Sequence, residues 1–251
     1  MKSLLLSDIH ANLPALEAIL EGERTWDEVI CLGDAIVAGP FPDEVLSLLR
    51  RLDAISVLGN HDREVLEIDV TAPAADAHWA WIQWTRRQLS FSNYRFLTTL
   101  PETRVLERQG VTMRLIHGDL PPEWGGRLWP DSAPEVFAWL ACRYPQPYIL
   151  FGHSHVQFRH TSGATTFVNP GTVGAPYLGQ AVICYGVLED GQFDLRVTTY
   201  DTEKTCRALD ERAPFDDREF AEAWKTCWRT GRQPSYYHIR DYAPLIARGY
   251  R

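Results

Sequence analysis

Five short motifs, each placed directly after a run of apolar residues, constrain the fold of this chain more than any other feature of its sequence. The motifs are Ser7-Asp8-Ile9-His10, Gly33-Asp34, Gly59-Asn60-His61-Asp62, His117-Gly118-Asp119 and Gly152-His153-Ser154-His155. The apolar runs before them have the length and composition of buried strands. Because loops at the carboxyl ends of neighbouring strands in an open α/β sheet meet in one crevice, we expect the five motifs to converge in space.

The segments between the first three apolar runs indicate an α/β fold. The runs cover residues 4–6, 29–32, 55–58, 113–116 and 148–151. Apolar residues recur at helical spacing over 13–20 and 45–52, so each pair of runs is joined by a helix. Such strand–helix–strand units predict parallel pairing with right-handed crossovers.

The second half of the chain has a different pattern. Residues 76–100 are rich in aromatic residues and predict a pair of helices over the core rather than a base-stacking surface. Arg108-Gln109-Gly110 separates two strand-like segments and predicts a hairpin, at which a second, partly antiparallel sheet begins. Further predictions are a loop over 119–130, a helix over 133–143, antiparallel strands over 165–168, 181–188 and 193–200, and a helix over 216–228.

The composition argues against several partners and locations. A formal net charge of -8 opposes binding to long nucleic acids, which requires clustered Lys and Arg. The apolar runs are far shorter than a membrane span, and the chain opens into residues 4–6 without a charged leader, so a cytoplasmic protein is expected. The five cysteines are odd in number and widely spaced, which is typical of reduced thiols.

Five of the eight histidines lie in the motifs, beside Asp8, Asp34 and Asn60, which are also of metal-ligand types. A single Asp-x-His is explained by a helix cap with a core histidine, and Gly-Asn-His-Asp by a plain turn, but all five motifs in order leave those explanations little room. One divalent ion takes about four to six ligands, so seven candidates are typical of two ions that share a carboxylate. The candidates are Asp8, His10, Asp34, Asn60, His117, His153 and His155.

The order of the motifs resembles that of the calcineurin-like metallophosphoesterase superfamily, which is Asp-x-His, Gly-Asp, Gly-Asn-His-Asp, His and Gly-His-x-His. The resemblance spans residues 4–200 and is closest to small prokaryotic phosphodiesterase-like members, through the stretches 7–12, 39–42 and 168–174. It implies a two-sheet α/β/β/α sandwich of mixed parallel and antiparallel strands. The chain is then a metallophosphoesterase domain over 1–200 with a C-terminal helical appendage over 201–251.

The resemblance also implies a role for each matching residue. The first metal would be held by Asp8, His10, Asp34 and His155. The second would be held by Asp34, Asn60, His117 and His153, with Asp34 bridging. Imidazole, carboxylate and amide donors suit divalent transition-metal ions (Mn, Fe, Zn, Ni or Co), of which Mn is favoured.

By the same resemblance, two such ions would supply an activated hydroxide between them for attack on phosphorus, with cleavage of a P–O ester bond. His61, which would stay unligated beside the metals, is the candidate general acid for the leaving group. Two interpretations of Asp62 remain open. It orients His61, or it is a surface turn carboxylate or the N-cap of a helix from Glu64 onward.

The stretch 33–39 lacks the arginine with which the phosphoprotein phosphatase and symmetrical dinucleoside-tetraphosphatase branch grips a terminal phosphate. A phosphodiesterase acting on a small phosphodiester or nucleotide-type substrate is therefore favoured over a phosphomonoesterase or dinucleoside polyphosphate hydrolase. Substitutes from other loops would be Arg63, Arg86, Arg127 or Arg159, each of which is expected to be a solvated charge instead.

A non-catalytic interaction scaffold, as in a retromer subunit of the superfamily, is the alternative of another class. The retention of His61 with every ligand argues for catalysis. A ligand sensor whose C-terminal tail binds a partner is compatible with activity, and the oligomeric state is left open. The tail residues Tyr236, Tyr237, His238 and Tyr242 are expected to pack on the core or on a second subunit.

Overall fold

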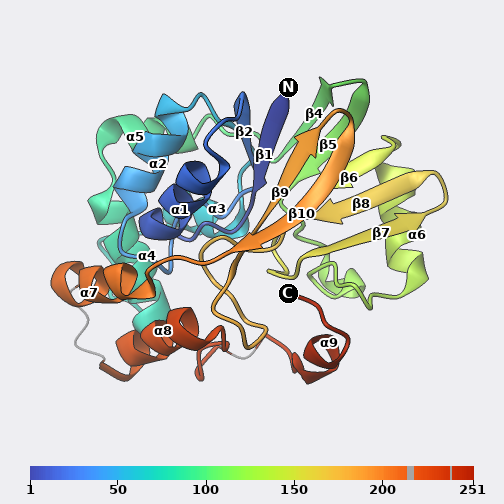
Figure 1. Ribbon diagram of the computed structural model, residues 1–251. Helices are drawn as coiled ribbons and strands as arrows, with labels where there is room; N and C mark the ends of the chain where they lie inside the picture. Colours follow the sequence, from blue (N-terminus) through green and yellow to red (C-terminus); the bar gives the residue numbers. More distant parts are fainter. Residues whose placement is uncertain (214–217, 238) are drawn as a thin grey trace.

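The computed structural model describes residues 1–213, 218–237 and 239–251. Within them, two five-stranded sheets have the orders β10-β9-β1-β2-β3 and β4-β5-β6-β8-β7. The sheets pack face to face with helices outside, as the predicted α/β/β/α sandwich requires (Figure 1). The strands are β1 (Lys2–Leu6), β2 (Glu28–Cys31), β3 (Ile55–Ser56), β4 (Thr103–Arg108), β5 (Val111–Ile116), β6 (Tyr148–Leu150), β7 (Phe158–Ser162), β8 (Thr165–Asn169), β9 (Ile183–Glu189) and β10 (Gln192–Thr198). The helices are α1 (Leu13–Glu23), α2 (Pro42–Arg51), α3 (Asn60–Glu67), α4 (Ala77–Gln88), α5 (Phe91–Leu97), the 3-10 helix η1 (Pro122–Trp124), α6 (Pro134–Arg143), α7 (Thr202–Arg212), α8 (Arg218–Thr230) and α9 (Ala243–Ala247).

The first sheet explains why its apolar runs are continuous rather than alternating. β1, β2 and β3 pair in parallel, as predicted, while β9 joins β1 antiparallel. Leu4 and Leu6 belong to the buried cluster under α1 and α2, whereas Leu5 belongs to the cluster between the two sheets. Because successive side chains of a strand point to opposite faces and both faces are covered here, every position of the run is apolar.

The helices after β1 and β2 begin where their sequences provide a cap. The side chain of Asn12 accepts a hydrogen bond from the backbone N–H of Ala15 at the start of α1. α2 starts with a proline, has acidic residues in its first turn and ends with two arginines, all of which favour a helix in that direction. Both helices return the chain to the far end of the sheet, so each next strand delivers its motif to the same edge.

Most predicted elements are present with shifted ends. Gln109-Gly110 joins β4 and β5 as the predicted hairpin and opens the second sheet, and α4 with α5 form the predicted helix pair. In the predicted loop 119–130, only the short η1 is helical. The predicted start of the helix at 216 lies outside the described residues, and the helix is described as α8 from Arg218.

The sequence does not predict β7, α3, α7 or α9. β7 is the edge strand of its sheet, and Phe158 is its one apolar residue, so it lacks the continuous apolar run of the inner strands. α3 begins inside the polar motif at Asn60, which the sequence alone explains equally well as a turn. β8 was expected to be purely antiparallel, but it pairs in parallel with β6 as well as antiparallel with β7.

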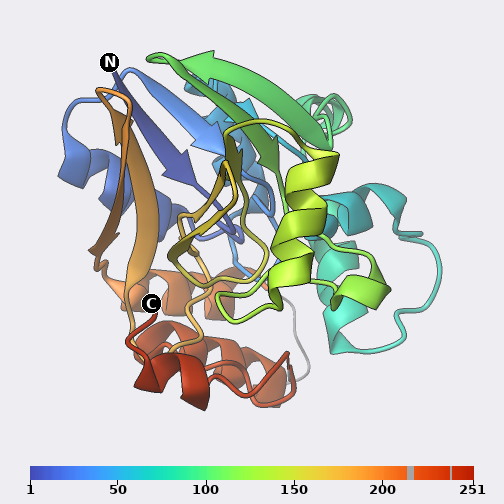
Figure 2. The same ribbon diagram turned by 90° about the vertical axis from the view of Figure 1, so that its right-hand side faces the viewer.

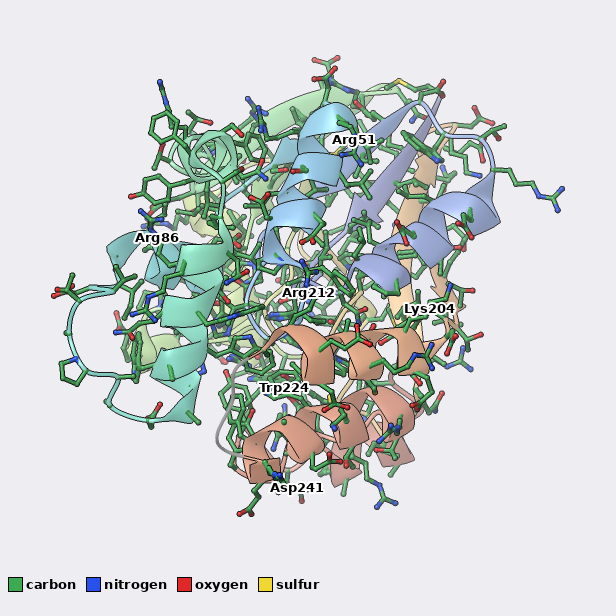
Figure 3. The ribbon with its side chains drawn as sticks, turned by 90° about the vertical axis from the view of Figure 1, so that its left-hand side faces the viewer. Arg51, Arg86, Lys204, Arg212, Trp224 and Asp241 are labelled. Carbon is green, nitrogen blue, oxygen red and sulfur yellow. The ribbon has the colours of Figure 1, made fainter. Side chains whose placement is uncertain are left out.

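The C-terminal helices pack at the end of the sandwich toward which β1 and β2 run (Figures 1 and 2). Figure 3 shows α7, which carries Lys204 and Arg212, between α8 and the helices α1 and α2. Arg212 forms an ion pair with Glu44 of α2. The ring of Trp224 on α8 lies 5.5 Å from and perpendicular to that of Trp81 on α4. The 201–251 region therefore shares a buried apolar cluster with the rest of the chain.

The prediction for the tail is confirmed for two of its four residues. Tyr242 is buried in the core cluster and Tyr237 packs against it, while Tyr236 is exposed and His238 lies outside the described residues. All five cysteines are free, and only Cys142 is exposed. Of the helices in the described ranges, none combines the length and the apolarity needed to cross a membrane.

Candidate metal centre

The five motifs converge at the carboxyl ends of the central strands, as predicted. The loop after β1 and the loop after β6 form the first ligand cluster, from Asp8, His10 and His155. His155 Nε2 lies 3.2 Å from Asp8 Oδ1 and 3.1 Å from His10 Nε2. All three side chains are buried, so their polar atoms face one another rather than water.

A second cluster lies beside the first and contains Asp34, His117 and His153. His117 Nε2 lies 3.2 Å from Asp34 Oδ2 and 3.2 Å from Asn60 Oδ1. Asp34 also accepts a hydrogen bond of 2.9 Å from the backbone N–H of His61. The structure thus brings all seven predicted ligands together, in two groups.

Two histidines have their tautomers set by the backbone. His117 Nδ1 donates a hydrogen bond to the carbonyl oxygen of Leu32 (2.7 Å), and His155 Nδ1 donates to that of Ala175 (2.8 Å). Since a carbonyl oxygen only accepts, the proton of each neutral ring is at Nδ1 and the lone pair is at Nε2. Outer contacts of this kind are those that orient metal-ligating histidines.

The side-chain amide of Asn60 lies among the atoms of the second cluster. Its Oδ1 lies 3.2 Å from His117 Nε2, 2.8 Å from His153 Nδ1 and 3.3 Å from Asp34 Oδ2. With Oδ1 in this position the amide oxygen faces acceptors, whereas an amide turned by 180° donates its N–H groups to the same atoms and accepts from the backbone N–H of His61. The orientation with Oδ1 inward is the one that fits a divalent ion, because nitrogen and oxygen donors then face the same point.

The electrostatics of the two clusters keep the carboxylates charged and two imidazoles neutral. Burial acts to raise the pKa of Asp8 and Asp34, but the histidines beside them outweigh it and hold both pKa values well below the usual range. Burial lowers the pKa of His117, yet the charge of Asp34 outweighs burial and raises it to about 10. Burial lowers the pKa of His153, and that of His10 to about 3.

The backbone of the motifs is strained. Asp8, His10, Asp34, His153 and His155 have φ angles of 52°, 50°, 52°, 65° and 60°. Non-glycine residues rarely adopt this left-handed region, and such strain clusters at functional sites. Five of the seven predicted ligands therefore have a backbone conformation that the surrounding fold must enforce.

The motif glycines are required by close approach of the ligands. A Cβ at residue 152 would lie 1.8 Å from Ser7 Oγ and 2.6 Å from Asp8 Oδ2. A Cβ at residue 59 would lie 2.1 Å from Asp34 Oδ1. Both distances are far shorter than a carbon atom tolerates, so any residue other than glycine at these two positions would displace the neighbouring carboxylates.

His61 lies beside the first cluster, with its ring centroid 5.5 Å from that of His10. Its Nδ1 lies 2.7 Å from Glu64 Oε2, one turn further along α3. Burial lowers the pKa of His61, but the charges of Asp34 and Glu64 outweigh burial and raise it. The carboxylate that orients His61 is therefore that of Glu64.

The expectations for Asp62 were wrong. Its carboxylate is fully buried and accepts hydrogen bonds from the backbone N–H groups of Gly59 (3.1 Å) and Ile36 (3.2 Å). Asp62 is thus neither a surface turn carboxylate nor an N-cap for a helix from Glu64, because α3 already begins at Asn60. It ties the Gly33-Asp34 loop to the Gly59-Asn60 loop, and burial with the charge of Asp34 raises its pKa to about 6.

Sequence reasoning missed two residues near the centre, Asp119 and Glu64, and misjudged a third, Arg127. Asp119 Oδ1 lies 3.6 Å from His153 Nδ1 and is part of a motif, so its position gave a signal. Glu64 is detectable only once α3 is known to begin at Asn60, which places it one turn from His61. Arg127 was expected to be a solvated charge. This expectation was wrong, because Nη1 of its guanidinium is buried.

The other three candidate arginines have partners or are exposed, and of these Arg63 lies near the centre through its contact with Asp119. Arg63 pairs with Asp119 (3.3 Å) and Glu102 (3.4 Å). The guanidinium of Arg86 stacks at 3.8 Å on the ring of Tyr94. Arg159 is exposed on the edge strand β7.

A two-sheet sandwich with two groups of metal-ligand side chains at the strand ends defines a metal-dependent hydrolase. The chain belongs to the calcineurin-like phosphoesterase superfamily, whose domain model matches residues 1–190. The resemblance found in the motifs is thereby confirmed. The protein is a phosphoesterase that depends on divalent metal ions.

Several proteins are similar to this chain over most of its length. Uncharacterized protein MJ0912 of Methanocaldococcus jannaschii is 29% identical over 231 residues, covering 83% of this chain and 93% of that protein. Phosphodiesterase YfcE of Escherichia coli K12 is 26% identical over 206 residues, covering 76% and 88%. A metallophosphoesterase structure from Sphaerobacter thermophilus superposes with a TM-score of 0.75 at 26% identity, covering 92% of this chain and 99% of that one.

Proposed function

We propose that this protein hydrolyses small phosphodiesters with two divalent metal ions. The observation that carries the proposal is the division of the ligands into two adjacent groups, each with one carboxylate and two imidazoles. The first ion would be bound by Asp8, His10, Asp34 and His155. The second would be bound by Asp34, Asn60, His117 and His153, so that Asp34 bridges.

Two divalent ions, when bound, supply an activated water nucleophile and positive charge for the phosphoryl oxygens. His61 is the proposed general acid. Its Nδ1 is engaged by Glu64 at 2.7 Å, which leaves Nε2 as the ring atom available to the substrate. From there the imidazolium donates its proton to the departing alkoxide, and Glu64 holds the ring while it does so.

The loop after Asp34 supports a diester rather than a monoester substrate. Ala35, Ile36, Val37 and Ala38 are all buried and apolar, so this loop offers a terminal phosphate dianion no cationic side chain. A diester carries one negative charge and needs less compensation. The similarity to phosphodiesterase YfcE points the same way. A phosphomonoesterase, a dinucleoside polyphosphate hydrolase or a non-catalytic scaffold would each give a different result in the assay below.

The finer features belong to the same proposal. Mn is the favoured ion, because the donors are imidazole, carboxylate and amide without thiolate. The free cysteines support a cytoplasmic location, since reducing compartments keep thiols unpaired. Residues 1–200 would form the phosphoesterase domain and 201–251 a helical addition that packs on it.

The test is to strip the protein of metal and return Mn, Ni, Zn, Mg or Fe. We expect two ions per chain by elemental analysis and hydrolysis of bis(p-nitrophenyl) phosphate in preference to p-nitrophenyl phosphate and dinucleoside polyphosphates. Asp34→Asn should cost more metal than loss of any single terminal ligand, because both ions lose a charged oxygen. A stoichiometry of one or less with all seven side chains intact would contradict the two-ion site.

A further inference from the structure

A groove of about 700 Å³ opens beside the proposed metal ligand His153. One wall comes from the 119–130 loop and includes Arg127 and Trp129. The opposite wall comes from the C-terminal tail and includes Tyr237 and Arg240. The groove therefore joins the metal centre to a part of the chain that lies beyond the family match at 1–190.

Arg127 is incompletely paired in this groove. Its Nη2 donates a hydrogen bond to Tyr237 Oη at 3.4 Å, while its Nη1 is buried without a hydrogen-bond partner. Tyr237 is held in turn by stacking on His78, with ring centroids 6.3 Å apart. A buried cation without an acidic partner is costly, and such groups are retained where a ligand satisfies them.

Arg240 provides an internal comparison. Its two terminal nitrogens each lie 3.0 Å from an oxygen of Asp131, and its guanidinium lies 4.6 Å above the ring of Trp129. Its charge is therefore already compensated. Of the two arginines that line the groove, Arg127 is the one that keeps a nitrogen free in the described part of the chain.

We propose that Arg127, positioned by Tyr237, binds the non-bridging oxygens of the substrate's phosphoryl group and so takes the place of the arginine missing after Gly33-Asp34. The inference rests on the proposed phosphodiesterase function and extends it to how a phosphodiester monoanion is held. A planar guanidinium donates in a geometry that matches two phosphoryl oxygens. The Tyr237 hydroxyl, which accepts from Arg127, keeps its own proton to donate to the same group.

The test compares the variants Arg127→Ala and Arg240→Gln with the wild type, all loaded with Mn. Loss of a hydrogen bond from a charged donor should weaken binding of inorganic phosphate, measured by isothermal titration calorimetry, roughly 10- to 100-fold in Arg127→Ala. The kcat/KM for bis(p-nitrophenyl) phosphate should fall by a similar factor. Arg240→Gln should stay within about threefold of the wild type in phosphate affinity and in kcat/KM, because the charge of Arg240 is already paired with Asp131.

Two further measurements separate ligand binding from a structural effect. Elemental analysis should find the wild-type metal content in Arg127→Ala, and added guanidinium chloride should restore part of its activity but none in Arg240→Gln. Wild-type phosphate affinity in Arg127→Ala, or loss of metal without rescue, would overturn the inference. If the wild type hydrolyses no diester while Arg127→Ala still loses phosphate, the proposed function fails and the phosphate site stands.

Discussion

Glu64→Gln removes the charge that orients the proposed general acid and keeps an oxygen that accepts from His61 Nδ1. The two side chains are 2.7 Å apart, and they are 10% (His61) and 29% (Glu64) exposed. A hydrogen bond to a charged group contributes about 1.5–3 kcal/mol, and the partial exposure of Glu64 places this one at the lower end. A loss of about 1.5 kcal/mol in the transition state lowers kcat roughly 10-fold.

The leaving group decides whether this loss concerns proton donation. A cyclic nucleotide departs as a basic alkoxide that needs a proton, whereas bis(p-nitrophenyl) phosphate departs as a stabilised phenolate. On the cyclic nucleotide we therefore expect kcat to fall roughly 10-fold in Glu64→Gln and about 10²- to 10⁴-fold in His61→Ala. On the aryl diester kcat should fall much less in both variants.

A double-mutant comparison tests whether Glu64 acts through His61. Once His61 is alanine, Glu64→Gln should lower kcat no further, because the group that it positions is gone. Equal losses on both substrates would show that His61 acts on the phosphoryl oxygens instead of the leaving group. Loss of a metal ion from His61→Ala would mean that His61 is a ligand, and additive losses in the double variant would refute the positioning role of Glu64.

Two predictions concern the scaffold. Gly152→Ala places a methyl group against Ser7 and Asp8 and should lower the unfolding free energy by about 1–3 kcal/mol in chemical denaturation. The control Gly22→Ala on α1, where a Cβ meets nothing within 4 Å, should raise the unfolding free energy by about 0.4–1 kcal/mol. Equal stabilities of the two variants would show that the Gly152 loop relaxes. Glu23 is the second site: burial acts to raise its pKa, but Lys2, Tyr185 and Arg196 outweigh burial and lower it from 4.5 to about 2. Because the pKa of Glu23 is lowered in the folded state, its carboxylate stabilises the fold above pH 4.5, and this contribution is lost as the pH falls toward 2. Glu23→Gln should therefore remove up to about 3 kcal/mol of stability at pH 7 and flatten the loss of stability that the wild type shows over this range. Parallel plots of unfolding free energy against pH for the two proteins would contradict the assignment.

The convergence of the candidate metal ligands was predictable because each depends on a local rule. Asp8 and His10 follow an apolar run that must be a strand, and parallel strands bring their carboxyl ends to one edge. The same rule places Asp34, Asn60 and the later histidines without any knowledge of the loops between them. Neither the strained φ angles of these residues nor the exact partners were needed to find the site.

The residues that tune the centre were not predictable in the same way. The relation of Glu64 to His61 depends on a helix that begins inside a polar motif, where capping decides the start and hydrophobic periodicity gives no signal. Asp62 is the reverse case, since its neighbour His61 suggests a catalytic role, but both its oxygens are used by backbone N–H groups. Sequence adjacency on a helix start is therefore a poor guide to which carboxylate a side chain meets.

Arg127 illustrates a third kind of information, which only the tertiary structure contains. Its partner Tyr237 lies 110 residues further along the chain, in a tail that α7 and α8 carry across the strand ends. Trp224 and Tyr242 pack in the core cluster on either side of Tyr237 in the sequence, which places Tyr237 beside the groove. The proposed phosphate contact thus combines Arg127, which lies between the candidate ligands His117 and His153 in the chain, with Tyr237 of the tail. We expect substitutions at Tyr237 to change phosphate binding without removing a candidate metal ligand.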